Sequence, residues 1–174
     1  NLSTGSFTGA GITDNGNGTA EFDPAVAGVG GPYDILYSYT NAYGCYSETL
    51  QTTSVSETPE VSFTGLESVY CVDGSVVTLT GDEPLGTFTG AGITDNGDGT
   101  ASFNPATAGA GGPYTIIFSY TTAEGCTDSY ELETEVFDYV AINFTGLAES
   151  YCEYNGLVQL NGSMAPEGDF SGPG

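Results

Sequence analysis

An internal repeat constrains this chain more than any other feature of its sequence. The segment Gly5–Gly16 (GSFTGAGITDNG) recurs almost unchanged as Gly86–Gly97 (GTFTGAGITDNG), which begins 81 residues later. The same offset relates four further pairs: Tyr33 and Tyr114, Cys45 and Cys126, Phe63 and Phe144, and Cys71 and Cys152. A tandem repeat of this length indicates a row of similar units, each of which contacts only its neighbours.

The phase of the repeat predicts where one unit ends and the next begins. Ser56–Glu60 (SETPE) separates two runs of strand-forming residues, and Phe137–Tyr139 stands one period later. We therefore expect the C-terminal part of one unit in residues 1–56, a complete unit in 57–138 and the N-terminal part of a third in 139–174. We expect the sequence to be an excerpt from a longer array, because half a unit leaves a sheet edge uncovered.

The complete unit has the composition of short strands joined by tight turns. Its clearest runs of β-branched and aromatic residues are Val61–Phe63, Val76–Thr80, Thr87–Thr89, Thr100–Phe103, Tyr114–Thr121 and Tyr130–Phe137. Alternation within Tyr114–Thr121 places Tyr114, Ile116, Phe118 and Tyr120 on one face, which we expect to be core. About seven strands in some 80 residues predict an all-β fold, in which each unit is an immunoglobulin-like β-sandwich.

The charge of the chain excludes several classes of function. It has 23 Asp and Glu residues and no Lys, Arg or His, so its formal net charge is −23. Such a chain cannot neutralise phosphates, which excludes nucleic-acid binding and attraction to anionic lipids. It also lacks the usual general base and the basic partner of a nucleophile, so we expect no enzymatic activity. No apolar run is long enough for a membrane span, and we expect no direct membrane insertion.

Four regularly spaced cysteines predict disulfides and an extracellular location. The alternative of a zinc site lacks support, because the chain has no Cys-x-x-Cys pair and no His. Two sets of bonds are physically sensible. In the preferred set Cys71 bonds Cys126 and gives the complete unit its own staple, while Cys45 and Cys152 bond residues outside the chain. In the other, Cys45 bonds Cys71 and Cys126 bonds Cys152, so that neighbouring units are linked.

Acidic side chains near the turns raise the question of calcium, which would relieve the repulsion among the carboxylates. The turns Asp14–Gly18 and Asp95–Gly99 lack the ligand spacing of an EF-hand loop, so we interpret both as hairpin turns. The calcium candidates at a unit junction and in the second turn are Glu57, Glu60, Asp82, Glu83, Asp95 and Asp98. We expect no other cofactor.

Tyrosines form a candidate platform for sugar rings. The candidates are Tyr33, Tyr43, Tyr46, Tyr70 and Tyr151. Two of them, Tyr33 and Tyr70, recur one period later as Tyr114 and Tyr151, which favours a structural role for those positions.

The landmarks of the complete unit also carry a resemblance. They are Tyr70–Cys71, Leu79–Gly81, Gly86–Gly92, Phe103–Ala106, Ala108–Gly109, Tyr114–Ile116, Tyr120–Thr121 and Gly125–Cys126. This pattern resembles the immunoglobulin-like tandem repeats of giant Bacteroidota cell-surface proteins, including the SprB-type gliding-motility adhesins exported by the type 9 secretion system. The resemblance implies an extracellular filament anchored to the cell surface.

These observations predict a structural and adhesive repeat of an elongated bacterial surface filament. Its expected partners are the adjacent units of the same chain, with surface glycans or other filaments as further candidates. The alternative is a spacer or carbohydrate-binding accessory module of a secreted carbohydrate-active protein. Binding of soluble glycans that depends on exposed tyrosines would favour this alternative.

Overall fold

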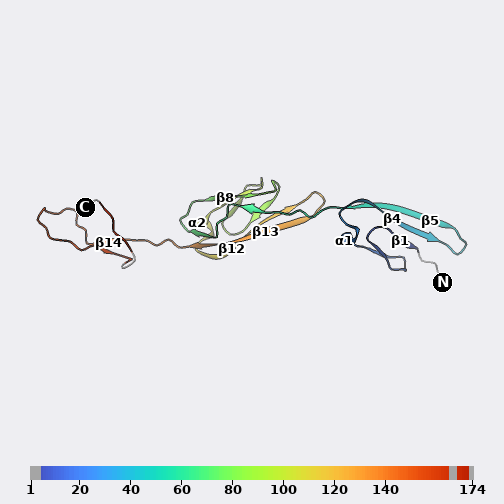
Figure 1. Ribbon diagram of the computed structural model, residues 1–174, viewed down its shortest axis with the longest axis horizontal. Coiled ribbons are helices and arrows are strands. Elements are labelled where there is room, and N and C mark those ends of the chain that lie inside the picture. Colours follow the sequence, from blue (N-terminus) through green and yellow to red (C-terminus); the bar gives the residue numbers. More distant parts are fainter. Residues whose placement is uncertain (1–4, 165–167, 173–174) are drawn as a thin grey trace.

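The computed structural model describes residues 5–164 and 168–172, and it is built mainly from β-strands in antiparallel sheets. The prediction of an all-β fold is therefore confirmed. The helices of the described residues are two single turns, α1 (Pro24–Ala27) and α2 (Pro105–Ala108). Figure 1 shows three regions along the chain, which we call the N-terminal, middle and C-terminal units.

The middle unit contains two four-stranded sheets. Its strands are β6 (Phe63–Thr64), β7 (Val69–Cys71), β8 (Val77–Gly81), β9 (Thr87–Thr89), β10 (Ile93–Asp95), β11 (Thr100–Phe103), β12 (Gly111–Thr121) and β13 (Thr127–Phe137). One sheet has the order β10-β11-β8-β6 and the other has the order β7-β13-β12-β9. All pairs are antiparallel except β7 with β13, which run parallel.

The core of the middle unit draws side chains from both sheets. Its buried apolar residues are Val61, Phe63, Leu79, Phe88, Ala101, Phe103, Ile116, Phe118 and Val136. The ring of Phe118 is at the centre, 4.6 Å from the ring of Phe88 and 6.4 Å from that of Phe63. The expectation that Ile116 and Phe118 face the core is confirmed, because both side chains are fully buried.

The N-terminal unit repeats the last five strands of the middle unit at the same offset. Its strands are β1 (Ser6–Thr8), β2 (Ile12–Asp14), β3 (Ala20–Phe22), β4 (Gly30–Thr40) and β5 (Tyr46–Val55). They form a sheet of order β1-β4-β5 and a β2-β3 hairpin. In the described residues β5 pairs only with β4, whereas its counterpart β13 carries β7 on the other side. The outer edge of β5 is therefore open.

In the part of the C-terminal unit that the structure describes, β14 (Phe144–Thr145) pairs with β15 (Asn161–Gly162). Phe144 is opposite Gly162, as Phe63 is opposite Gly81 in the middle unit. Residues 56–62 and 138–143 form no helix or strand. The unit boundaries expected at residues 57 and 139 lie in these two segments, and they stay predictions.

Candidate functional site

The strand register separates the two cysteines expected to bond within the middle unit. Cys71 ends β7 and lies opposite Phe137, the last residue of β13, whereas Cys126 immediately precedes the first residue of that strand. At about 3.3 Å per residue, the 11 residues of β13 place these cysteines roughly 35 Å apart. A disulfide needs Cα atoms within about 7 Å. The preferred bond between Cys71 and Cys126 does not fit this register, and the four cysteines are unpaired.

The other predicted set of bonds fits no better. Cys45 lies in the turn between β4 and β5, which is at the end of the N-terminal unit farthest from the middle unit (Figure 1). Cys71 lies beside the end of β13 that leads toward the C-terminal unit. A bond between Cys45 and Cys71 would have to span both units.

A shallow groove at the junction of the N-terminal and middle units contains Cys126. It is lined by Phe22, Pro24, Thr53, Ser54, Val55, Ser56, Glu124 and Cys126. The turn between β12 and β13 thus meets the end of β5, as Figure 1 shows. Cys126 is half-buried here, while its counterpart Cys45 is exposed. We call this feature the junction groove.

Sequence reasoning missed the junction groove. The signal was present in the repeat itself, because Phe22 and Pro24 are the counterparts of Phe103 and Pro105. Both middle-unit residues are fully buried, whereas Phe22 is 38% exposed. The sequence does not show that Tyr70 covers Phe103, with 5.0 Å between the ring centres. Without that contact, the exposure of the counterpart Phe22 could not be predicted.

The calcium candidates of the second turn accept hydrogen bonds from residues of the same turn. The Asp98 carboxylate accepts hydrogen bonds from the hydroxyl of Thr100 at 2.6 Å and from its N–H at 3.0 Å. These two bonds hold the pKa of Asp98 below its ordinary value. Asp95 accepts a bond from the N–H of Gly97 at 3.2 Å. Both side chains therefore stabilise the turn between β10 and β11.

The candidates at the junction are not gathered into a ligand set. Asp82 accepts a hydrogen bond from the Ser62 hydroxyl at 2.8 Å. Partial burial raises the pKa of Asp82, but hydrogen bonds from Ser62 outweigh it and leave this pKa below its ordinary value. Within residues 5–164 and 168–172, no three acidic or cysteine side chains converge as a metal site would require. Glu57, Glu60 and Glu83 thus join no such group.

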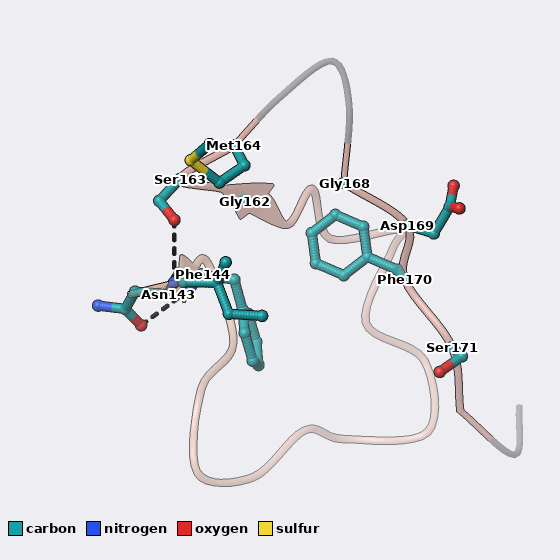
Figure 2. Close-up of a pocket in the computed structure, with 10 residues that line it drawn as sticks. Asn143, Phe144, Gly162, Ser163, Met164, Gly168, Asp169, Phe170 and Ser171 are labelled. Carbon is teal, nitrogen blue, oxygen red and sulfur yellow. Dashed lines mark hydrogen bonds between the residues drawn. The ribbon is translucent and has the colours of Figure 1, made fainter. Parts of the chain in front are cut away.

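A hollow lies in the C-terminal unit (Figure 2). It is lined by Ile142, Asn143, Phe144, Gly162, Ser163, Met164, Gly168, Asp169, Phe170 and Ser171. The rings of Phe144 and Phe170 meet edge to face at 6.0 Å, and the N–H of Asn143 donates to the Ser163 hydroxyl at 2.9 Å. The same edge-to-face pair occurs in the middle unit between Phe63 and Phe88, at 5.2 Å, where Phe118 covers it. The hollow therefore has the side chains of a unit core.

Most of the candidate tyrosines hold loops in place. The hydroxyl of Tyr33 donates to the carbonyl of Gly28 at 3.1 Å, and that of Tyr114 donates to Gly109 at 3.2 Å. The hydroxyls of Tyr70 and Tyr151 accept hydrogen bonds from the N–H groups of Glu67 and Ala148 at 2.8 and 2.7 Å. These bonds give the four repeated tyrosines structural roles.

The other two tyrosines project from the β4–β5 turn region. Tyr43 is 93% exposed and Tyr46 is 60% exposed. The Tyr46 hydroxyl donates to the carboxylate of Glu48, and this bond raises the pKa of Tyr46. The exposed ring of Tyr46 beside the Glu48 carboxylate can contact a polar ligand that has an apolar face, and Tyr43 exposes a second ring in the same turn region.

Comparisons with known proteins leave the family of the chain open. No protein-family model matches it, and a search of curated proteins finds no similar sequence. In the described part of the chain, neither helix has the length or the apolar character needed to cross a membrane.

Proposed function

We propose that this chain is a segment of an elongated filament on a bacterial cell surface, with a structural and adhesive role. The observation that carries the proposal is that the chain enters and leaves the middle unit at opposite ends. Val61 lies at the entry, where its N–H donates to the Asp128 carboxylate at 3.2 Å, close to the start of β13. The exit follows Phe137, at the other end of the same strand. Units joined in this way extend the chain with every repeat.

The arrangement of the sheets supports the immunoglobulin-like part of the proposal. Two four-stranded sheets of the middle unit contribute to one aromatic core, as expected of a β-sandwich. The recurrence of β1–β5 as β9–β13 supports a repeating unit of 81 residues. In both copies the aromatic residue of the first strand packs against the long strand, at 4.5 Å for Phe7 and Tyr37 and 4.6 Å for Phe88 and Phe118.

The hydrogen bonds at the exit suit a unit under tension. The parallel pair of β7 and β13 is closed by bonds from Glu135 N–H to Ser68 carbonyl at 3.0 Å and from Val72 N–H to Phe137 carbonyl at 2.8 Å. A pull on Val61 and on Phe137 in opposite directions first loads β6, which pairs with β8, and then slides β7 along β13. Because the bonds lie across that direction, they must break together, which raises the force that the unit withstands.

The net charge suits an extracellular filament. A net charge of −23 makes neighbouring copies repel, which keeps filaments dispersed. The sequence resemblance to repeats of giant Bacteroidota surface proteins makes a gliding-motility adhesin exported by type 9 secretion the specific form of this proposal.

Single-molecule force spectroscopy on the full chain, held by its two ends, tests the tension-bearing role. We expect one dominant unfolding event for the middle unit, with about 25 nm of released contour at roughly 3.5 Å per extended residue. Gradual extension at low force without this event would contradict the proposal. Electron microscopy of antibody-labelled cells supplies the second test, in which the label must follow thin surface filaments. Label confined to a compact protein would contradict it equally.

The exposed Tyr43 and Tyr46 favour a second candidate, a carbohydrate-binding accessory module. Soluble glycan binding by the full chain that is lost in Tyr43→Ala and Tyr46→Ala would support this function. The matched control is Tyr33→Phe, which removes a hydroxyl that bonds the Gly28 carbonyl and leaves the exposed rings intact.

A further inference from the structure

The outer edge of β5 corresponds to the edge of β13 that pairs with β7 in the middle unit. There, β7 pairs with β13 in the register Val69 to Glu135, Tyr70 to Val136 and Cys71 to Phe137. The counterparts of these three β13 residues, 81 positions earlier in β5 and just after it, are Ser54, Val55 and Ser56. The N–H of Ser54 and the carbonyl of Ser56 are therefore the groups that would bond a strand placed like β7.

The apolar surface beside this edge is also complementary to such a strand. In the middle unit the ring of Tyr70 covers Phe103, which is fully buried. In the N-terminal unit the counterpart Phe22 is 38% exposed and lines the junction groove with Pro24. A tyrosine at the Tyr70 position of an added strand would lie over Phe22 and remove it from water.

The third residue of the added strand, at the position of Cys71, would be a cysteine. It would lie at the junction groove, which Cys126 lines. In the register of the middle unit, a cysteine placed like Cys71 stands opposite Ser56. Neighbouring strands are about 4.8 Å apart. Ser56 and Cys126 line the same groove, so the incoming thiol would lie in the groove that contains the thiol of Cys126.

We propose that the open edge of β5 binds a Val-Tyr-Cys strand of the β7 type, in parallel register, and that its cysteine forms a disulfide with Cys126 of the following unit. The bond links the β7-type strand of one unit to the β12–β13-type turn of the next. Each thiol loses one proton and one electron, and a low-molecular-weight disulfide such as oxidised glutathione is reduced to two thiols. The inference deepens the proposed function, because it specifies how successive units of a filament are joined.

The test uses the full chain and a synthetic peptide with the sequence of residues 66–74, LESVYCVDG. Both are incubated in a glutathione redox buffer with moderate salt, which screens their negative charges. The sites that acquire the peptide are then mapped by mass spectrometry after cleavage at Asp and Glu, because the chain has no Lys or Arg. We expect the peptide on Cys126 in preference to Cys45, by about tenfold, since docking raises the effective concentration of its thiol.

Cys45 is the internal control, because it occupies the same turn position and is more exposed than Cys126. Labelling that follows exposure, with Cys45 modified at least as fast as Cys126, would overturn the proposal. A peptide with Ala in place of tyrosine keeps the thiol but should no longer modify Cys126 in preference to Cys45. The unchanged peptide should also lose this preference when the chain carries Phe22→Ala. A preference unchanged by both substitutions would also overturn it.

Hydrogen exchange gives a second readout that does not depend on the disulfide. A peptide with Ser in place of cysteine should slow amide exchange at Ser54 and leave Gln51 unchanged. No protection at Ser54 would contradict strand addition. Force spectroscopy measures the middle unit without any peptide, so failure of strand addition and failure of the filament role are distinguishable.

Discussion

The ring of Tyr70 lies 5.0 Å from that of Phe103, and this contact joins the parallel edge strand β7 to the core of the middle unit. The hydroxyl of Tyr70 accepts a bond from the N–H of Glu67, which fixes the chain that leads into β7. The same side chain thus contributes apolar cover at one end and a backbone partner at the other.

Replacement of Tyr70 should destabilise the middle unit in two separable steps. Tyr70→Phe removes the hydroxyl that Glu67 bonds and should cost about 1 kcal/mol. Tyr70→Ala also uncovers Phe103 and should cost about 2–3 kcal/mol, less than a fully buried ring because Tyr70 is only half-buried. Urea denaturation of the full chain measures both values. Equal costs for the two variants would contradict the role of the ring.

Gly86 should tolerate no larger side chain, because the ring of Phe118 occupies the place of its Cβ. An ideal Cβ at Gly86 would lie 2.1 Å from that ring, and neighbouring aromatic rings hold Phe118 in position. Gly86→Ala should therefore destabilise the unit by about 1–3 kcal/mol. The control is Gly156→Ala, where the structure has open space and no positive φ.

The clash at Gly86 also predicts a rescue. Phe118→Leu alone should be destabilising, because it leaves a gap in the core. In the Gly86→Ala background the same change should cost less, since the smaller side chain makes room for the new methyl group. Strictly additive free energies of unfolding in this double-mutant cycle would show that the two residues do not interact.

The parts of this fold that sequence could predict are those with a local signal. Alternation over Tyr114–Thr121 identified the core positions Ile116 and Phe118, and β-branched and aromatic runs located most of the strands. The short strand β7 is not among the predicted strands, although Val69 and Tyr70 are typical strand residues. Its pairing with the distant Phe137 depends on the whole topology.

The preferred disulfide does not fit the strand register for the same physical reason. The prediction pairs Cys71 with Cys126 because each unit would then have its own staple. Whether they are close depends on the direction of β7 relative to β13, which residue spacing does not contain. The parallel register places the two cysteines at opposite ends of β13, and it places Cys126 beside β5 of the preceding unit instead.

The repeat itself supplies a control for the charge of Asp98. Its counterpart Asn17 accepts bonds from Thr19 at 3.0 and 2.6 Å, the distances that Asp98 has to Thr100. The pKa of Asp98 lies below its ordinary value of 3.8 in the folded chain, so its ionised form stabilises the fold above that pH. This stabilisation is lost as the pH falls through the lower, folded value.

Asp98→Asn should therefore change stability by a pH-dependent amount. At pH 7 the variant should lose only the charge-assisted part of the bonds to Thr100, and its deficit relative to the parent should shrink as the pH falls from above the ordinary pKa of Asp98 to below its folded pKa. Thermal unfolding of both chains across this range measures the difference. A deficit that stays constant with pH would contradict the ionised role of Asp98.

Divalent cations should stabilise the chain through screening and not through a specific site. The net charge is −23, and in the described residues no three acidic side chains converge on one position. Calcium and magnesium at the same concentration should then raise the melting temperature equally. A rise with calcium alone that saturates at low concentration would instead require a calcium site.

Thr134 should be replaceable by valine with a gain in stability. Its side chain is 1% exposed, and its hydroxyl has no hydrogen-bond partner within the described residues. A buried hydroxyl without a partner costs free energy, and Val has nearly the same shape, so Thr134→Val should stabilise the middle unit by about 1 kcal/mol. The control is Thr53→Val at the counterpart position in the N-terminal unit, which is only half-buried and should gain less. Denaturant midpoints measure both variants, and a loss of stability at Thr134 would show that its hydroxyl is satisfied in solution by a buried water.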